Sequence, residues 1–322
     1  EKAEIATLPI NDEREAMWRK LNDLDQVRPM IQIYQIPWHE MNVDDELTLR
    51  CSGEAAKMIE RALRQEIYQW KHMPGDMIVR PVIRSPYVVH DTGFGISEES
   101  DLITLEEGST APSRHFHIQI RDEEDLQKIK MPVITYDPDA TEARYQALKD
   151  AFDGILEVKK QGIAGFWFAP WDELVRWWGV QEVLMDLAMR PEMVHKGIGR
   201  LVDAYLARLD QYVCQNLLAP NHFGTNATGE LPGGDFDPSR VLPHNMWSVG
   251  AAQVFSEVSP EMHEEFAIDH EIRWYSRFGL NYYGCCEPLH KKVKVVGKIP
   301  NLRKISMSPW INLEEGASNI GT

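Results

Sequence analysis

The chain has 322 residues, with 34 Lys and Arg against 50 Asp and Glu, which gives a formal net charge of −16. Its composition is 43% hydrophobic and 26% charged, as in globular proteins, and disfavours disorder, collagen-like repeats and a coiled coil. The acidic balance excludes DNA or RNA as a partner, because binding a polyanion requires a dense basic surface.

Residues 1–76 are predicted to form an N-terminal helical extension. Helix-favouring stretches cover residues 13–24 and 47–70, a short strand is expected at residues 30–34, and a turn comes next at residues 73–76.

From residue 77 onward, short β-favouring runs alternate with longer amphipathic stretches. Strands are expected at residues 77–83, 87–89, 162–169, 251–258, 279–284 and 304–307. Helices are expected at residues 141–160, 191–218 and from Ser259 as N-cap to about Arg277, with a short helix from Pro288.

This alternation predicts parallel βα units and an α/β fold. We expect residues 77–322 to form a (β/α)8 TIM barrel whose last βα unit lies beyond Thr322. The missing initiator Met suggests that the native chain also begins earlier. A doubly wound sheet is the alternative, but no Gly-rich phosphate-binding turn follows any predicted strand.

The chain contains neither a signal peptide nor an apolar run of membrane-spanning length, and its four cysteines form no disulfide framework. These features predict a cytoplasmic protein that contacts no membrane.

Two adjacent cysteines follow the strand predicted at residues 279–284. Cys285 and Cys286 precede Glu287 and the expected helix start, where a helix N-terminus would lower the pKa of a thiol. Because ligands of parallel α/β folds bind at the carboxyl ends of strands, the thiols are candidate ligands of a soft metal. The alternative is two small buried apolar side chains.

Other candidate residues occupy further predicted strand ends. Glu257 could act as a metal ligand or general base, or be a solvated acid beside a helix start. His222 and Asn226 follow the long helix, although a lone His is more often a pocket or core residue. His90 with Asp91 closes an early strand, where such a pair could bind substrate or relay a proton.

The remaining His residues and the aromatic cluster have simpler interpretations. His115 and His117 suit a half-buried strand face, and His263 and His270 are expected at the surface of a helix. The aromatic residues of 166–178 could line an apolar substrate wall, but they more often form core or a subunit contact, which would permit a homodimer.

Three stretches resemble the uroporphyrinogen decarboxylase superfamily, a (β/α)8 barrel family. They are residues 162–205, residues 253–266 (QVFSEVSPEMHEEF) and residues 279–309 (GLNYYGCCEPLHKKVKVVGKIPNLRKISMSP). The last matches the Cys-containing turn of the family's zinc-dependent methyltransferases, which transfer methyl groups to or from corrinoid proteins. The resemblance implies a methyltransferase that binds zinc and acts on a small methylated substrate, such as a methoxy-aromatic compound or a methylamine.

The resemblance implies a role for one residue, and further roles are inferred for residues at the predicted strand ends. Cys286 matches the family Cys, and Cys285 and Glu257 are inferred as further zinc ligands. Glu257 and His222 are candidate catalytic residues, and four residues are candidates for substrate binding: His90, Asn226, Gln253 and Tyr283.

The sequence departs from the family in two respects. The His of the zinc motif is replaced, and the arginine-rich motif that binds tetrapyrrole carboxylates has no match. The alternatives are a cofactor-free decarboxylase or other lyase, for which Arg80, Arg84 and Arg121 would have to cluster, and a non-catalytic binding barrel.

Overall fold

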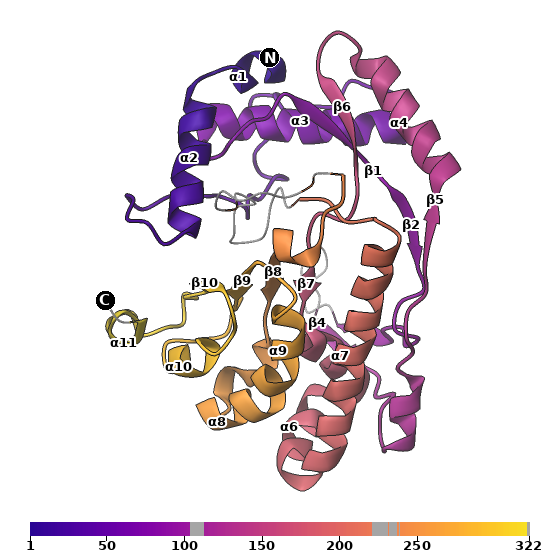
Figure 1. Cartoon of the computed structure of the whole chain (residues 1–322), viewed down its shortest axis with the longest axis vertical. Helices are drawn as coiled ribbons and strands as arrows, with labels where there is room; N and C mark the ends of the chain where they lie inside the picture. The colour runs from indigo at the N-terminus through magenta and orange to yellow at the C-terminus, as the bar shows by residue number, and fades with distance from the viewer. Residues whose placement is uncertain (104–112, 221–230, 232–236, 238, 321–322) are drawn as a thin grey trace. The chain divides into compact units, whose positions relative to one another are not determined.

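The computed structural model describes residues 1–103, 113–220, 231, 237 and 239–320 as a mixed α/β protein (Figure 1). The chain divides into two compact units. Unit 1 comprises Glu1–Pro86, Asp139–Gln161 and Glu230–Asp235, and unit 2 comprises Tyr87–Pro138, Gly162–Gly229 and Phe236–Thr322. In the described part of the chain, no helix is long and apolar enough to cross a membrane.

Unit 2 is built on a four-stranded parallel sheet in the order β10-β9-β8-β7 (Figure 1). The strands are β7 (Trp167–Phe168), β8 (Trp247–Gly250), β9 (Leu280–Tyr283) and β10 (Leu302–Ile305). Helical segments separate consecutive strands, as parallel pairing requires. All carboxyl ends of these strands therefore lie at the same edge of the sheet.

The helical segments of unit 2 follow the strands in chain order. After β7 come α5 (Pro170–Trp178), α6 (Val180–Met189) and α7 (Pro191–Cys214), and the short 3-10 turn η2 (Pro243–Asn245) precedes β8. After β8 come η3 (Gln253–Glu257), α8 (Pro260–His263), the π-helical η4 (Glu264–Ile268) and α9 (Asp269–Tyr275). α10 (Val293–Val296) follows β9, and α11 (Leu313–Ile320) follows β10.

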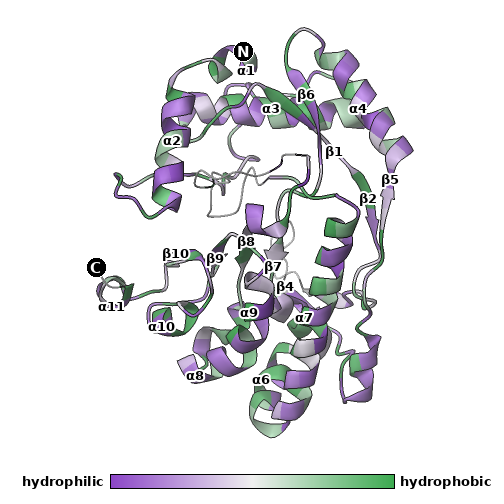
Figure 2. Ribbon diagram, viewed as in Figure 1, coloured by the Kyte–Doolittle hydropathy of each residue, from purple (hydrophilic) through white to green (hydrophobic). Residues whose placement is uncertain are grey.

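Helix α9 packs on one face of the sheet. The indole ring of Trp274 stacks on Phe168 of β7 with ring centroids 4.6 Å apart, and its Nε1 donates to Ser248 Oγ of β8 at 2.7 Å. Asn281 of β9 donates to the carbonyl of Tyr275 at 3.0 Å. Figure 2 shows hydrophobic and hydrophilic residues alternating around α7, which buries Val194, Ile198 and Leu201.

Two antiparallel strand pairs and a 3-10 turn complete unit 2. β2 (Val88–Asp91) pairs with β5 (Ile134–Asp137), and β3 (Ser100–Ile103) pairs with β4 (Ser113–Phe116). The turn is η1 (Glu124–Lys128).

Unit 1 contains α1 (Lys2–Ala6), α2 (Ile10–Asn22), α3 (Glu54–His72), most of α4 (Pro138–Phe152) and the parallel pair β1 (Val82–Pro86) and β6 (Glu157–Gln161). Ile5, Met77 and Val79 form its small apolar core. The predicted boundary between residues 76 and 77 falls within the first segment of this unit.

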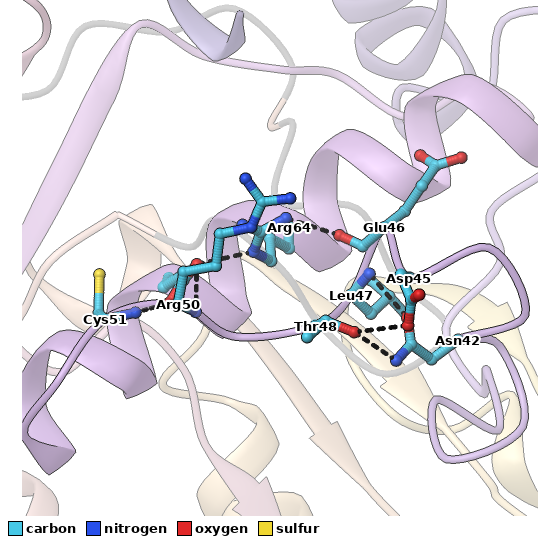
Figure 3. A network of polar contacts seen from close by, with 9 residues as sticks. Asn42, Asp45, Glu46, Leu47, Thr48, Arg50, Cys51 and Arg64 are labelled. Carbon is cyan, nitrogen blue, oxygen red and sulfur yellow. Dashed lines mark hydrogen bonds and ion pairs between the residues drawn. The ribbon is translucent and has the colours of Figure 1, made fainter.

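A polar network fixes the segment before α3 to that helix (Figure 3). The Glu60 carboxylate accepts from the backbone N–H groups of Arg50 and Cys51, both at 2.8 Å, and pairs with Arg64 at 2.8 Å. Arg64 also donates to the carbonyl of Glu46 at 2.8 Å. The backbone bond from Cys51, together with those from Arg50 and Arg64, lowers the pKa of Glu60 to about 2.

Several predicted elements are confirmed. The long helix, the strand at 279–284 and the Ser259 cap, whose Oγ accepts from Met262 N at 3.2 Å, are present. The predicted strand at 251–258 is wrong, because β8 ends at Gly250 and residues 253–257 form a 3-10 turn. The predicted helix from Pro288 is also wrong, since α10 begins at Val293. His263 is fully buried instead of exposed.

Parallel βα units are therefore present, as the sequence predicts. The described residues contain no closed barrel, because their strands form one four-stranded and three two-stranded sheets. The (β/α)8 barrel stays a prediction.

Candidate functional site

Polar side chains gather at the carboxyl edge of the four-stranded sheet. Asp172 follows β7 in the first turn of α5, and Gln253 follows β8. Cys285, Cys286 and Glu287 follow β9, and Ser306 follows β10. In parallel α/β folds this edge is where ligands bind, so we take it as the candidate site.

Glu287 links the loops that follow β8 and β9. Its side chain is only 1% exposed, and both carboxylate oxygens accept backbone hydrogen bonds. Oε2 accepts from Cys285 N at 2.9 Å, and Oε1 accepts from Ala252 N at 3.3 Å. A buried carboxylate is tolerated when it is hydrogen-bonded in this way. Glu287 thus holds the backbone of Cys285 against the neighbouring loop.

The Cys285 backbone is fixed from two further directions. Ser306 Oγ donates to the Cys285 carbonyl at 2.8 Å, and Gly284 N donates to the Gly250 carbonyl at 2.8 Å. Gly284 has a φ of +106°, and a Cβ there would lie 2.5 Å from Leu289 Cδ1. Only glycine fits this position without strain, so the turn that presents the thiols is sterically defined.

The two thiols lie side by side, with their Sγ atoms 3.5 Å apart. Cys285 is half-buried and Cys286 is exposed. Burial, together with the hydrogen bond to Cys286, raises the pKa of Cys285 to about 12. The prediction of a lowered thiol pKa is therefore wrong for Cys285, because no helix begins directly behind it to stabilise a thiolate.

Asp172 and Gln253 form a second contact at this edge. Gln253 Nε2 donates to Asp172 Oδ2 at 2.9 Å. Burial raises the pKa of Asp172, while the Gln253 hydrogen bond and the charge of Arg176 oppose the shift. Asp172 is therefore a carboxyl group that can hold a proton at higher pH than an exposed Asp.

Glu257, expected at a strand end, lies instead on the 3-10 turn η3 with its side chain exposed. Near it is Lys292, which is 4% exposed and donates from Nζ to the Phe255 carbonyl. Burial lowers the pKa of Lys292, and the charges of Glu287 and Glu257 oppose this shift. This amine therefore ties the loop after β9 to the turn after β8.

The remaining predicted site residues are His222, Asn226, His90 and Tyr283. His222 and Asn226 lie outside the described residues. His90 is exposed on β2, and its neighbour Asp91 forms an ion pair with Arg208 at 2.9 Å. Tyr283 is fully buried on β9, where its hydroxyl lies 2.7 Å from His263 Nε2.

No group of three or more His, Cys, Asp or Glu side chains that could hold a metal is found among the described residues. Glu257 is thus not brought together with both thiols as a preformed ligand set. The two sulfur atoms remain a soft donor pair within reach of one ion.

The sequence reasoning missed Asp172, Lys292 and the anchoring role of Glu287. Asp172 carried a usable signal, because it stands in the first turn after a predicted strand closed by Pro170. Lys292 carried none, since its contact with the Phe255 carbonyl depends on the tertiary fold.

Comparison of the chain with family models, curated proteins and solved structures found no match. The resemblance to the uroporphyrinogen decarboxylase superfamily therefore stays a prediction.

Proposed function

We propose that this chain is a zinc-dependent methyltransferase of the (β/α)8 barrel type, which moves a methyl group between a small methylated substrate and a corrinoid protein. The observation that supports this proposal is the pair of thiols, 3.5 Å apart, at the carboxyl edge of a parallel sheet. The barrel would be completed by strands beyond the four that are paired in unit 2.

The thiol pair fits zinc as part of a ligand set. Two sulfur ligands at about 2.3 Å from a tetrahedral zinc lie roughly 3.8 Å apart, which is close to the observed separation. Cys285 and Cys286 would hold the ion, and Glu257, which the structure does not bring together with both thiols, would have to approach them to act as the third ligand. Bound zinc would supply Lewis-acid chemistry that stabilises the heteroatom from which, or to which, the methyl group moves.

The protein's own residues would position and protonate the reactants. Glu287 and Ser306 fix the Cys285 backbone, so the thiols need little reorganisation. Asp172, whose pKa is raised by burial, would give a proton to the demethylated heteroatom in the donor direction. Gln253 would orient that carboxyl group through its hydrogen bond.

Zinc content and methyl transfer test the proposal together. We expect purified protein to contain about one zinc per chain. Cys285→Ser and Cys286→Ser should each lower the zinc content and the methylation of free cob(I)alamin by methoxybenzene or a methylamine. Cys51→Ser and Cys214→Ser are matched controls, because these exposed thiols lie elsewhere and should leave both quantities unchanged.

Glu257→Gln tests the third ligand separately. Loss of zinc in this variant, with retention in Glu264→Gln, would support the assigned set. Stoichiometric zinc in a Cys285→Ser, Cys286→Ser double variant would contradict the metal site. Decarboxylation by zinc-free protein, with no methyl transfer, would favour the lyase instead.

A further inference from the structure

Two histidines face each other where α7 packs against α9 (Figure 1). His195 lies near the start of α7, and His270 lies at the start of α9. Nδ1 of His195 and Nε2 of His270 are 2.9 Å apart and share a hydrogen bond, in which one ring donates and the other accepts. Imidazole nitrogens are also the commonest ligands of transition metals in proteins, so the pair is a candidate metal site.

The carboxylate of Glu265 orients the first of these rings. Its Oε1 lies 3.3 Å from Nε2 of His195, and we assign the ring proton to that nitrogen, which then donates to the carboxylate. The opposite nitrogen, Nδ1, therefore carries a lone pair that points towards His270. The ring is also stacked on Phe266, with centroids 4.7 Å apart. A carboxylate that accepts from a histidine in this way is the usual outer partner of a metal-bound imidazole.

The separation of the two nitrogens suits one ion. Two imidazole nitrogens bound at about 2.05 Å and at a right angle lie about 2.9 Å apart, whereas a tetrahedral angle separates them by about 3.3 Å. The 2.9 Å between His195 and His270 therefore fits a square-planar or octahedral ion better than tetrahedral zinc. Binding requires the tautomer of His270 that carries its proton on Nδ1, and a slight rotation of both rings towards the ion.

The surroundings of the pair are compatible with a positive ion. The neighbouring cation Lys196 is already paired with Glu123 at 2.6 Å. Arg273, on α9, is likewise paired with Asp203 at 2.6 Å. The side chain of His195 is 30% exposed and lines a hollow of about 390 Å3, so water can reach an ion bound there.

We propose that His195 and His270 form a two-histidine site for a divalent transition-metal ion of the nickel or copper type, which would bridge α7 and α9. Glu265 would position His195. The described residues add no third His, Cys, Asp or Glu ligand, so water would occupy the remaining coordination positions. The inference goes beyond the proposed function, because it holds whether or not Cys285 and Cys286 bind zinc.

Calorimetric titration of the untagged protein with Ni²⁺ tests the proposal. We expect one Ni²⁺ per chain to bind in a Cys285→Ser, Cys286→Ser variant, which lacks the soft donor pair of the candidate site. In that variant, His195→Ala and His270→Ala should each weaken Ni²⁺ binding at least tenfold. Glu265→Ala should weaken it about tenfold, because the ring of His195 loses the partner that orients it.

His72→Ala is the matched control. His72 is also an exposed histidine hydrogen-bonded to a carboxylate, that of Glu46 at 3.0 Å, but it lies in unit 1 and should leave Ni²⁺ binding unchanged. Mg²⁺, which prefers oxygen ligands, should not bind to the histidine pair.

Thermal unfolding gives a second measurement. The two ligands come from different helices, so Ni²⁺ should raise the unfolding temperature of the intact protein, and His270→Ala should abolish this rise. Unchanged Ni²⁺ affinity in His195→Ala and His270→Ala, or loss of Ni²⁺ binding in the cysteine variant, would overturn the proposal. Should the histidine variants fail to fold, absence of the temperature rise in the unmodified protein would overturn it as well.

Discussion

Glu271 lies in the interior of unit 2, where its carboxyl group is fully buried and forms no well-aligned hydrogen bond with a described residue. Burial, together with the charges of Glu287 and Asp172, raises the pKa of Glu271 well above 4.5, although the Tyr275 hydroxyl opposes the shift. The folded state therefore binds a proton that the unfolded state releases above about pH 4.5.

This bound proton determines how the contribution of Glu271 to the free energy of unfolding changes with pH. The stabilising contribution is fully present below the unfolded pKa and is lost as pH rises towards the folded pKa. Glu271→Gln should therefore raise the free energy of unfolding at neutral pH by about 1–3 kcal/mol, and by little at pH 4. Chemical denaturation at both values measures this effect. Glu124→Gln, an exposed control, should change neither value, and an equal effect of Glu271→Gln at both pH values would contradict the assignment.

At the scale of an element, α7 carries two glycines with opposite surroundings. A Cβ on Gly197 would lie 2.9 Å from Cζ3 of Trp178, which is fully buried and held by a 2.8 Å hydrogen bond to Asp186. A Cβ on Gly199 would meet its nearest atom, His270 Nδ1, at 3.8 Å.

The same substitution should therefore change stability in opposite directions at the two positions. Gly199→Ala should stabilise the protein by about 0.5–1 kcal/mol, because alanine favours the helix. Gly197→Ala should destabilise it by about 1–3 kcal/mol, because the buried indole ring cannot move away. The midpoints of denaturant-induced unfolding measure the stability changes of both variants. Destabilisation by Gly199→Ala would contradict the open surroundings described for Gly199.

The sequence predicts the helices of unit 2 better than its strands. α7 shows helical spacing over many turns, so its periodicity is clear without tertiary information. Residues 251–258 are rich in β-favouring side chains, yet the chain leaves the sheet at Gly250, and Glu287 captures the Ala252 N–H from 35 positions away. Such a contact cannot be read from local pattern.

At the scale of the whole molecule, residues 1–76 share a core with residues 77–80. Met77 and Val79 pack with Ile5, and Asn11 Oδ1 accepts from Val79 N at 2.8 Å. Arg80 is paired with Glu15 at 2.6 Å. The segment predicted to be an extension thus contributes contacts on which residue 77 and its neighbours depend.

A chain shortened to residues 77–322 should consequently be less stable than the intact protein. Each apolar side chain uncovered costs roughly 1.5–3 kcal/mol. Asn11→Ala in the intact chain tests the same contact and should cost about 1–3 kcal/mol, because it leaves the Val79 N–H unpaired. Thermal unfolding compares the three proteins, and equal transition temperatures would contradict this dependence.

The candidate site shows a similar division between features that the sequence predicts and features that it does not. Cys285 and Cys286 are found from position alone, because they directly follow a predicted strand that is present. Asp172 and Lys292 lie near them only through long-range hydrogen bonds and burial, and Glu287, although it is the next residue, reaches the Ala252 N–H only in the fold. The predicted barrel would likewise require strand pairings that no local pattern specifies.

The π-helical segment Glu264–Ile268 determines which side chains of the helix that covers the sheet point in the same direction. Tyr275 lies twelve positions after His263. In a regular α-helix, the side chains of two residues at this spacing would point about 120° apart. A π-helical turn contains about one residue more than an α-helical turn. The rotation about the helix axis from His263 to Tyr275 is therefore close to three full turns. Both side chains therefore face Tyr283. Deleting one residue from this segment would preserve that alignment, whereas a deletion within α7 would rotate everything beyond it by about 100°.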